Sequence, residues 1–175
     1  VPEATRLLVR SMEEYNCDMV ISDFYRVSGE RLAQKGDIEE DKVMSRQEFA
    51  SYMIENPADF YYGVLWNKMY RRSIIEEYHI RMDTSISWCE DFLFNLEYIR
   101  HAESFFALQV PIYYYLKRRG SLVSQGASIT NTVRMKSNIF EYYNEFYKDV
   151  YEDKDYADIR LQAVSYTHLR AHETC

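Results

Sequence analysis

Two adjacent carboxylates, Glu90 and Asp91, stand near the head of the apolar, aromatic segment SWCEDFLFNLEY, residues 87–98. A positioned carboxylate can take a proton from a reacting hydroxyl, so this pair could serve acid–base catalysis. The same residues also fit a structural role. Ser87 and Glu90 have the spacing of a capping box, and an acid such as Asp91 is favourable in the first turn of any helix. The pair alone leaves both explanations open.

A group of three cations, Lys117, Arg118 and Arg119, follows an aromatic run and precedes Gly120. The planar guanidinium of Arg can pair with two phosphate oxygens at once, so this group could hold a diphosphate. A solvated strand end is the alternative explanation.

Trp66, Asn67 and Lys68 combine an aromatic ring with two hydrogen-bonding side chains. The face of a Trp suits the apolar face of a sugar, and Asn and Lys can bond hydroxyl groups. These residues could therefore line the binding site of a sugar acceptor. The alternative for Trp66 is a core position under the predicted sheet.

Two of the four His, His168 and His172, are spaced i, i+4 in the last stretch, residues 164–175. On a helix this spacing could present two metal ligands. The stretch, however, resembles the in-frame translation of a transposase adapter used in sequencing libraries, and such segments are excluded from fold reasoning. We therefore predict no metal site in this chain, one domain over residues 1–163 and a non-native tail over residues 164–175.

The composition sets limits on function. A net charge of −7 argues against nucleic acid as the main partner. The three Cys are widely spaced and form no CxxC pair, which favours a reducing compartment, the cytoplasm. No apolar run reaches the ~20 residues that a membrane-spanning helix needs.

Helical and strand patterns alternate along the chain, which predicts an α/β fold. Ser45 and Glu48 form a capping box ahead of an apolar helix that Asn56 closes. A short buried strand is predicted around Met19 to Ile21. The polar stretch over residues 28–43 predicts a hairpin or surface loop. Further elements are predicted as helices near residues 2–15, 72–78, 90–99 and 129–150 and as two strands in residues 104–118.

Several segments together resemble the C-terminal half of a bacterial family 2 glycosyltransferase. LWNKMYRRSII (residues 65–75) resembles the family's W-N-K-L-Y-R-R segment, and CEDFLFNLEY (89–98) resembles its E-D-x-x-F segment. YYYLKRRGSLVSQ (113–125) resembles its closing Y-Y-x-x-R-x-G-S element, and residues 1–27 resemble the stretch after its nucleotide-binding D-x-D. The segments occur in the family's order over nearly all of residues 1–163.

The resemblance implies a partial GT-A fold, a Rossmann-like α/β sheet that lacks its N-terminal nucleotide-binding strands, plus a C-terminal helix. The family's D-x-D, which would bind Mg²⁺ or Mn²⁺, is expected upstream of Val1. Asp18 and Asp23 bracket the first predicted strand at a spacing that is not D-x-D. We therefore expect this chain to be the acceptor-side part of an enzyme and to be inactive alone.

By the same resemblance, Asp91 is the base of an inverting transfer and Glu90 supports the site. The implied partners are a nucleotide-sugar donor and a glycan or lipid-linked sugar acceptor, in cell-surface polysaccharide synthesis, with peripheral association at the inner face of the membrane. A non-enzymatic α/β interaction module is the alternative function. The sequence also leaves open whether burial or the helix start controls the pKa of Asp91.

Overall fold

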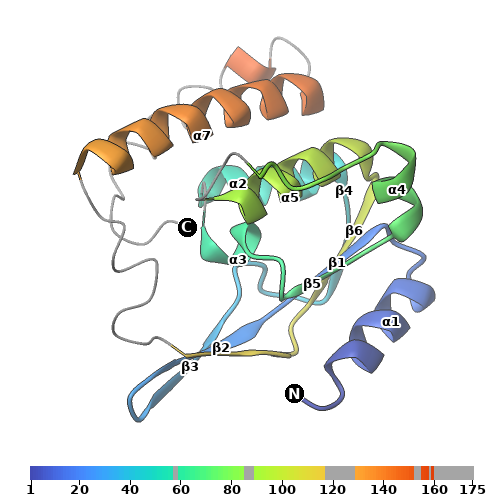
Figure 1. Cartoon of the computed structure of the whole chain (residues 1–175). Helices are drawn as coiled ribbons and strands as arrows, with labels where there is room; N and C mark the ends of the chain where they lie inside the picture. Colours follow the sequence, from blue (N-terminus) through green and yellow to red (C-terminus); the bar gives the residue numbers. More distant parts are fainter. Residues whose placement is uncertain (57–58, 85–88, 117–128, 152–154, 158, 160–175) are drawn as a thin grey trace.

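A four-stranded sheet forms the centre of the protein (Figure 1). The computed structural model describes residues 1–56, 59–84, 89–116, 129–151, 155–157 and 159, with only the backbone for 129–139. The strand order is β4 (Lys42–Ser45), β6 (Ser104–Leu108), β1 (Met19–Ser22) and β5 (Lys68–Tyr70). Strands β1 and β6 are parallel, while β4 and β5 run antiparallel to them as the outer strands.

The two central strands are buried on both faces, which explains why their sequences are continuously apolar. Side chains alternate along a strand. Met19 and Ile21 of β1 therefore enter one core cluster, and Val20 enters another on the opposite face. Phe105 and Phe106 of β6 divide in the same way.

Helices cover both faces of this sheet. Helix α1 (Ala4–Glu14) packs on one face through Leu8. The larger cluster on the other face includes residues of α2 (Arg46–Glu55), α3 (Phe60–Gly63), α4 (Arg72–Glu77) and α5 (Glu90–His101). Helix α7 (Ile129–Val150) lies outside them and contacts α5 and α2. No helix in the described part of the chain is long and apolar enough to cross a bilayer.

A second sheet extends from the carboxyl ends of the two central strands. It has the order β3 (Arg31–Lys35), β2 (Phe24–Ser28) and β7 (Tyr114–Leu116). Strand β2 follows β1 after one residue, Asp23, and β7 follows β6. The parallel pair β1–β6 of the first sheet therefore continues as the parallel pair β2–β7 of the second. Strands β2 and β3 form the hairpin that the polar stretch predicted.

The predicted α/β class is confirmed, and so is the first capping box, because the Ser45 side chain accepts a hydrogen bond from the Glu48 N–H at 3.2 Å. The second capping box is wrong. Helix α5 begins at Glu90, so this residue is the first of the helix and cannot be the third, as the motif requires. Its N-cap is Cys89, which has a left-handed backbone (φ 63°) and makes no side-chain cap bond. Ser87 lies outside the described residues.

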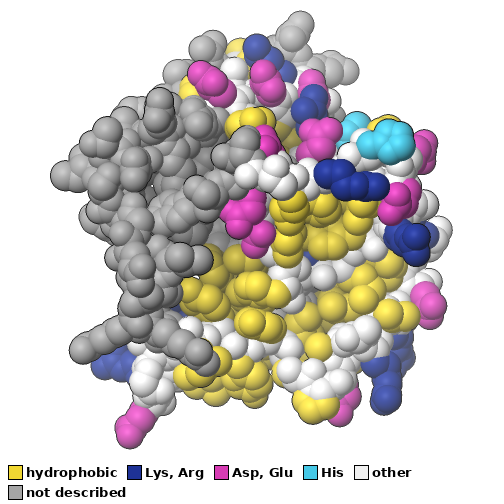
Figure 2. Space-filling model, in the orientation of Figure 1, with side chains coloured by type: hydrophobic (Ala, Val, Ile, Leu, Met, Phe, Trp, Pro, Cys, Tyr) yellow, Lys and Arg dark blue, Asp and Glu magenta, His cyan; other side chains and the backbone are white. Residues whose placement is uncertain are grey.

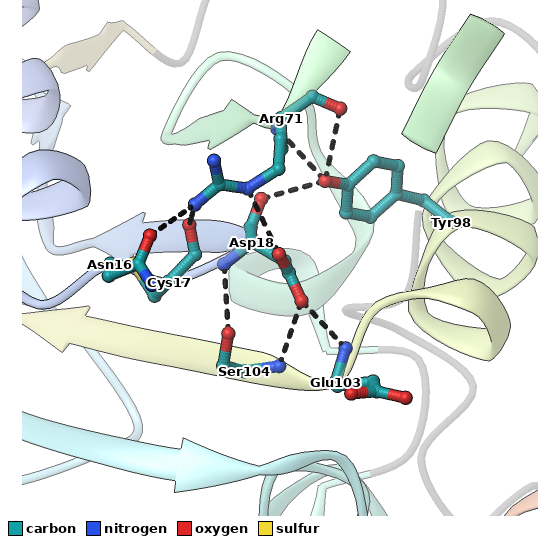
Figure 3. A network of polar contacts seen from close by, with 7 residues as sticks. All are labelled: Asn16, Cys17, Asp18, Arg71, Tyr98, Glu103 and Ser104. Atoms are coloured by element: carbon teal, nitrogen blue, oxygen red, sulfur yellow. Dashed lines mark hydrogen bonds and ion pairs between the residues drawn. The ribbon is translucent and has the colours of Figure 1, made fainter. Parts of the chain in front are cut away.

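The amino ends of β1 and β6 are fastened by a polar network around Asp18 (Figure 3). One carboxylate oxygen pairs with Nε of Arg71 at 3.0 Å. The other accepts hydrogen bonds from the backbone N–H groups of Glu103 and Ser104, at 2.9 and 3.2 Å. The Tyr98 hydroxyl donates to the Asp18 carbonyl at 2.7 Å and accepts from the Arg71 N–H. Both carboxylate oxygens of Asp18 are thus used within the protein.

Candidate functional site

The candidate site is built around the turn over residues 64–67, which is anchored to the carboxyl end of β1. The Ser22 N–H and hydroxyl both donate to the Asn67 carbonyl, at 2.9 and 3.1 Å. In return, Nδ2 of Asn67 donates to the Ser22 carbonyl at 3.1 Å. Since Asn67 is fully buried, this reciprocal pairing fixes the turn against the strand.

Helix α5 holds the other side of the same turn through Asn95. Its buried Nδ2 donates to the carbonyls of Tyr62 and Gly63, at 2.9 and 2.8 Å, where α3 ends. Its Oδ1 accepts from the Tyr70 hydroxyl at 2.6 Å. Asp91 precedes Asn95 by four residues and so lies on the same face of α5. The helix therefore presents Asp91 to the turn that Asn95 secures.

Lys68 places a cation beneath this turn. Its Nζ donates to the carbonyls of Tyr61 and Val64, at 2.8 and 2.5 Å, and to Oδ1 of Asn67 at 2.8 Å. Burial lowers the pKa of Lys68 well below its ordinary value, while the charge of Asp91 opposes that shift. Three acceptors match the three N–H donors of an ammonium group, whereas a neutral amine has only two. We therefore assign Lys68 as the charged form.

Asp91 is partly exposed at the first turn of α5, close to Lys68. Burial raises the pKa of Asp91 above its ordinary value, and the adjacent Glu90 adds to the rise. The Lys68 charge and a hydrogen bond from the Leu65 backbone act in the opposite direction without cancelling it. Burial therefore outweighs the stabilising groups around this carboxylate, which makes Asp91 a stronger base than an ordinary Asp.

The three proposed acceptor-binding residues, Trp66, Asn67 and Lys68, differ from one another in exposure. Trp66 is partly exposed and belongs to an aromatic cluster, stacked on Tyr113 with ring centroids 4.2 Å apart and meeting Phe24 edge-on at 4.9 Å. The side chains of Asn67 and Lys68 are buried and bonded within the protein, so they support the turn. Direct contact with an acceptor stays a prediction, and among the three residues Trp66 is the one that is not buried.

The proposed diphosphate-binding residues, Lys117, Arg118 and Arg119, directly follow β7 but lie outside the described residues. The same holds for the tail over residues 164–175. Among the residues that the structure describes, no three His, Cys, Asp or Glu side chains are grouped as metal ligands would be. Binding of Mg²⁺ or Mn²⁺ stays a prediction.

Sequence reasoning gave no role to Asp23, the residue between β1 and β2. It is 5% exposed, and burial raises its pKa. Its Oδ2 accepts from Nε2 of Gln34 at 2.7 Å, but its Oδ1 has no hydrogen-bond partner within the described chain. An added Cβ on Gly36 would lie 1.9 Å from this Oδ1, so a larger residue there would displace the Asp23 carboxylate. The sequence signal was an acid at the end of an apolar strand.

The face shown in Figure 2 carries hydrophobic side chains over the region of β5 and α5, with acidic side chains beside them. Tyr70 of β5 and Phe94 of α5 are partly buried and pack on the core, with ring centroids 5.7 Å apart.

The chain was also compared with known proteins. No family model matches it. It is 27% identical over 116 residues to EpsJ of Bacillus subtilis (strain 168), an uncharacterized glycosyltransferase. This match includes 66% of the chain and 34% of EpsJ, so the chain spans about a third of that relative's length.

The solved structures of S. aureus TarS, residues 1–349, share the fold. The complex with UDP-GlcNAc has a TM-score of 0.65 at 16% identity and covers 94% of this chain and 44% of TarS. The complex with UDP has a TM-score of 0.63 at 13% identity, covering 91% and 41%. The predicted fold class is therefore confirmed. The chain has the α/β fold of S. aureus TarS over less than half of that protein and is similar in sequence to a Bacillus glycosyltransferase.

Proposed function

We propose that this chain is the acceptor-side part of a glycosyltransferase that moves a sugar from a nucleotide-sugar to a hydroxyl of a glycan or lipid-linked acceptor. One observation carries the proposal: the partly buried carboxylate of Asp91, whose pKa is raised, sits at a helix start beside the turn at the carboxyl end of β1. In open α/β sheets, ligands bind beyond the carboxyl ends of the parallel strands.

Asp91 acts as the general base in this proposal. Its carboxylate takes the proton of the acceptor hydroxyl while the acceptor oxygen forms a bond to the anomeric carbon. The bond between that carbon and the donor's phosphate oxygen breaks, and the nucleoside diphosphate leaves with the electron pair. Attack from the face opposite the leaving group inverts the anomeric configuration.

The surroundings of Asp91 suit this role in two ways. Burial and Glu90 raise its pKa and so strengthen it as a base. The Lys68 ammonium and the Leu65 N–H keep the carboxylate ionised and oriented before the reaction. A residue needed only to start a helix gains nothing from a raised pKa, because the helix start favours the charged form.

Several finer features belong to the same proposal. The S. aureus TarS structures contain UDP-GlcNAc and UDP, which supports a nucleotide-sugar as the donor class. We further propose membership of family 2, inversion at the anomeric carbon, a role in cell-surface polysaccharide synthesis, and a cytoplasmic location with peripheral attachment to the inner face of the membrane. Lys117, Arg118 and Arg119 would hold the diphosphate, and Mg²⁺ or Mn²⁺ would bind upstream.

The deciding experiment measures sugar transfer by the enzyme that contains this chain, with UDP-GlcNAc as the first donor among common nucleotide-sugars. Wild type should transfer, and Asp91→Asn should not, while both should bind UDP equally in calorimetric titration. Equal transfer by the two proteins would reject Asp91 as the base. Absence of both transfer and nucleotide binding in the wild type would favour the alternative, a non-enzymatic interaction module.

A further inference from the structure

A groove of about 200 Å³ opens between helices α5 and α7. The two helices lie against each other in this region, as Figure 1 shows. Glu90, Leu93 and Glu97 recur at the spacing of one helix face and form the α5 wall. Tyr142 and Glu145 stand on the α7 wall. The groove therefore includes Glu90 but not Asp91, which lies on the side of α5 that faces the turn.

Core packing explains Leu96 and Phe146 in the lining of this groove, but not Tyr142 and Glu145. Tyr142 is 44% exposed, although an aromatic ring of this size would gain free energy from burial. Glu145 is exposed beside it, three residues along the same face of α7. The helices are joined below them, where the rings of Phe92 and Tyr143 lie 5.0 Å apart. Tyr142 and Glu145 are therefore positioned by a packed helix pair without being needed to hold it.

The negative charge of the groove disfavours anionic ligands. Its lining holds four carboxylates and two guanidinium groups, which leaves an excess of two negative charges. One of the two cations, Arg100, is already paired with Glu97 at 3.2 Å and with Asp149. Arg81 pairs with Glu76 at 3.1 Å. Such a groove repels phosphate and sulfate groups, whereas carboxylates accept hydrogen bonds readily from neutral hydroxyls.

We propose that this groove binds the uncharged, hydroxyl-rich end of the glycan acceptor. Tyr142 would contact the apolar face of a sugar ring, and Glu90 and Glu145 would accept hydrogen bonds from its hydroxyls. The identity of the ligand as an acceptor rests on the proposed function, but binding of neutral glycan to the groove can be tested by itself.

The test is an NMR titration of the ¹⁵N-labelled chain with neutral tetrasaccharides of glucose, galactose, mannose and N-acetylglucosamine, and with a sulfated tetrasaccharide as the anionic probe. At least one neutral probe should shift amide signals of the groove residues on α5 and α7, and the sulfated probe should not. Tyr142→Ala should weaken binding by about two- to twelvefold, since aromatic contacts contribute about 0.5–1.5 kcal/mol. Glu145→Gln should weaken it less.

Tyr78→Ala is the matched control, because Tyr78 is 46% exposed but lies outside the groove lining. It should bind like wild type. The proposal is overturned if no neutral probe shifts groove signals, if the sulfated probe binds better, or if Tyr142→Ala binds as well as the control. A positive titration combined with an active Asp91→Asn enzyme would retain the groove and reject only the base.

Discussion

The carboxylates at the two ends of strand β1 differ in how completely the protein bonds to them. At the amino end, Asp18 has both oxygens bonded, to Arg71 and to two backbone N–H groups. At the carboxyl end, Asp23 keeps one oxygen without a partner in the described chain, and Asp91, across the turn, has a raised pKa. At the amino end of β1, the carboxylate holds two segments of the fold together. At the carboxyl end, burial disfavours the charged form of the carboxylates.

This difference separates structural from reactive acids by a physical criterion. A carboxylate whose two oxygens both bond to other parts of the chain holds those parts together. A partly desolvated carboxylate with fewer such contacts takes a proton more readily. By this criterion Asp91 belongs with the reactive acids and Asp18 with the structural ones, although both lie in polar surroundings at the end of a strand or helix.

The largest expected effect is the loss of turnover in Asp91→Asn, in the enzyme that contains this chain. Asn keeps the size of the side chain but cannot take a proton, so kcat should fall by about 10²–10⁴-fold, or about 3–5 kcal/mol of barrier. Steady-state kinetics with donor and acceptor would measure this, and urea unfolding should show stability at or above that of wild type.

Glu90→Gln is the matched control for Asp91→Asn. It removes the same charge from the same helical turn, so a general effect of acidity at the helix start would appear equally in both variants. We expect Glu90→Gln to lose much less activity than Asp91→Asn, because the base is kept and the Gln amide oxygen can still accept a hydrogen bond from the acceptor. Equal losses in the two variants would mean that the first turn, and not Asp91 itself, matters.

The second effect should occur at the opposite end of β1 and affect stability alone. Asp18→Ala removes the ion pair with Arg71 and leaves the N–H groups of Glu103 and Ser104 without their acceptor. Chemical denaturation should show a loss of about 2–4 kcal/mol in the free energy of unfolding. Turnover per folded molecule should stay near wild type. A selective loss of kcat in Asp18→Ala would contradict the division between the two ends.

The third effect tests the cation beneath the turn. Lys68→Met removes the charge that lowers the pKa of Asp91, so this pKa should rise further. The acidic limb of the pH–rate profile, where Asp91 becomes protonated, should therefore move to higher pH. Stability should fall by about 1–2 kcal/mol, because the carbonyls of Tyr61 and Val64 lose one bond each but keep others from amide side chains. An unmoved acidic limb would show that Lys68 only supports the turn.

The smallest effect concerns Asp23, whose pKa is raised in the folded protein by burial. The folded state therefore binds this proton more tightly than the unfolded state does, so ionisation of Asp23 costs stability as the pH rises. Asp23→Asn should be more stable than wild type by about 0.5–1 kcal/mol at neutral pH. The difference should shrink as the pH falls toward the ordinary Asp value of 3.8, as denaturation at several pH values would show. A variant less stable at every pH would contradict this expectation.

Local patterns in the sequence were enough to predict much of the fold. The apolar run at Met19 to Ile21 gave a buried strand, and the Ser45 box gave a helix start, because both signals depend on neighbours in sequence. The Ser87 box failed because the left-handed backbone of Cys89 starts the helix later than the spacing suggested. Three-residue spacing marks a capping box only where the chain actually enters the helix.

The candidate site was predicted less completely, since it depends on contacts between distant segments. Asp91 was identified through family resemblance, but its raised pKa depends on burial that the sequence does not display. Asn67 and Lys68 follow Trp66 directly, yet they turn inward because the turn is bonded to Ser22. Asp23 gains its unusual surroundings from Gln34 and Gly36, which a hairpin brings back to it.

The outer position of strand β5 has a practical consequence for anyone who purifies the chain. The backbone groups of Asn67 and Arg71 form hydrogen bonds with β1. Because backbone groups alternate in direction along an antiparallel strand, those of Lys68 and Tyr70 point away from β1. The described chain has no further strand on that side of β5. A long edge of this kind is a template for pairing with a second polypeptide, but β5 has only three residues and its Lys68 N–H already donates to the Leu65 carbonyl at 3.1 Å. We therefore expect concentrated solutions to show no self-association along β5, as light scattering would test.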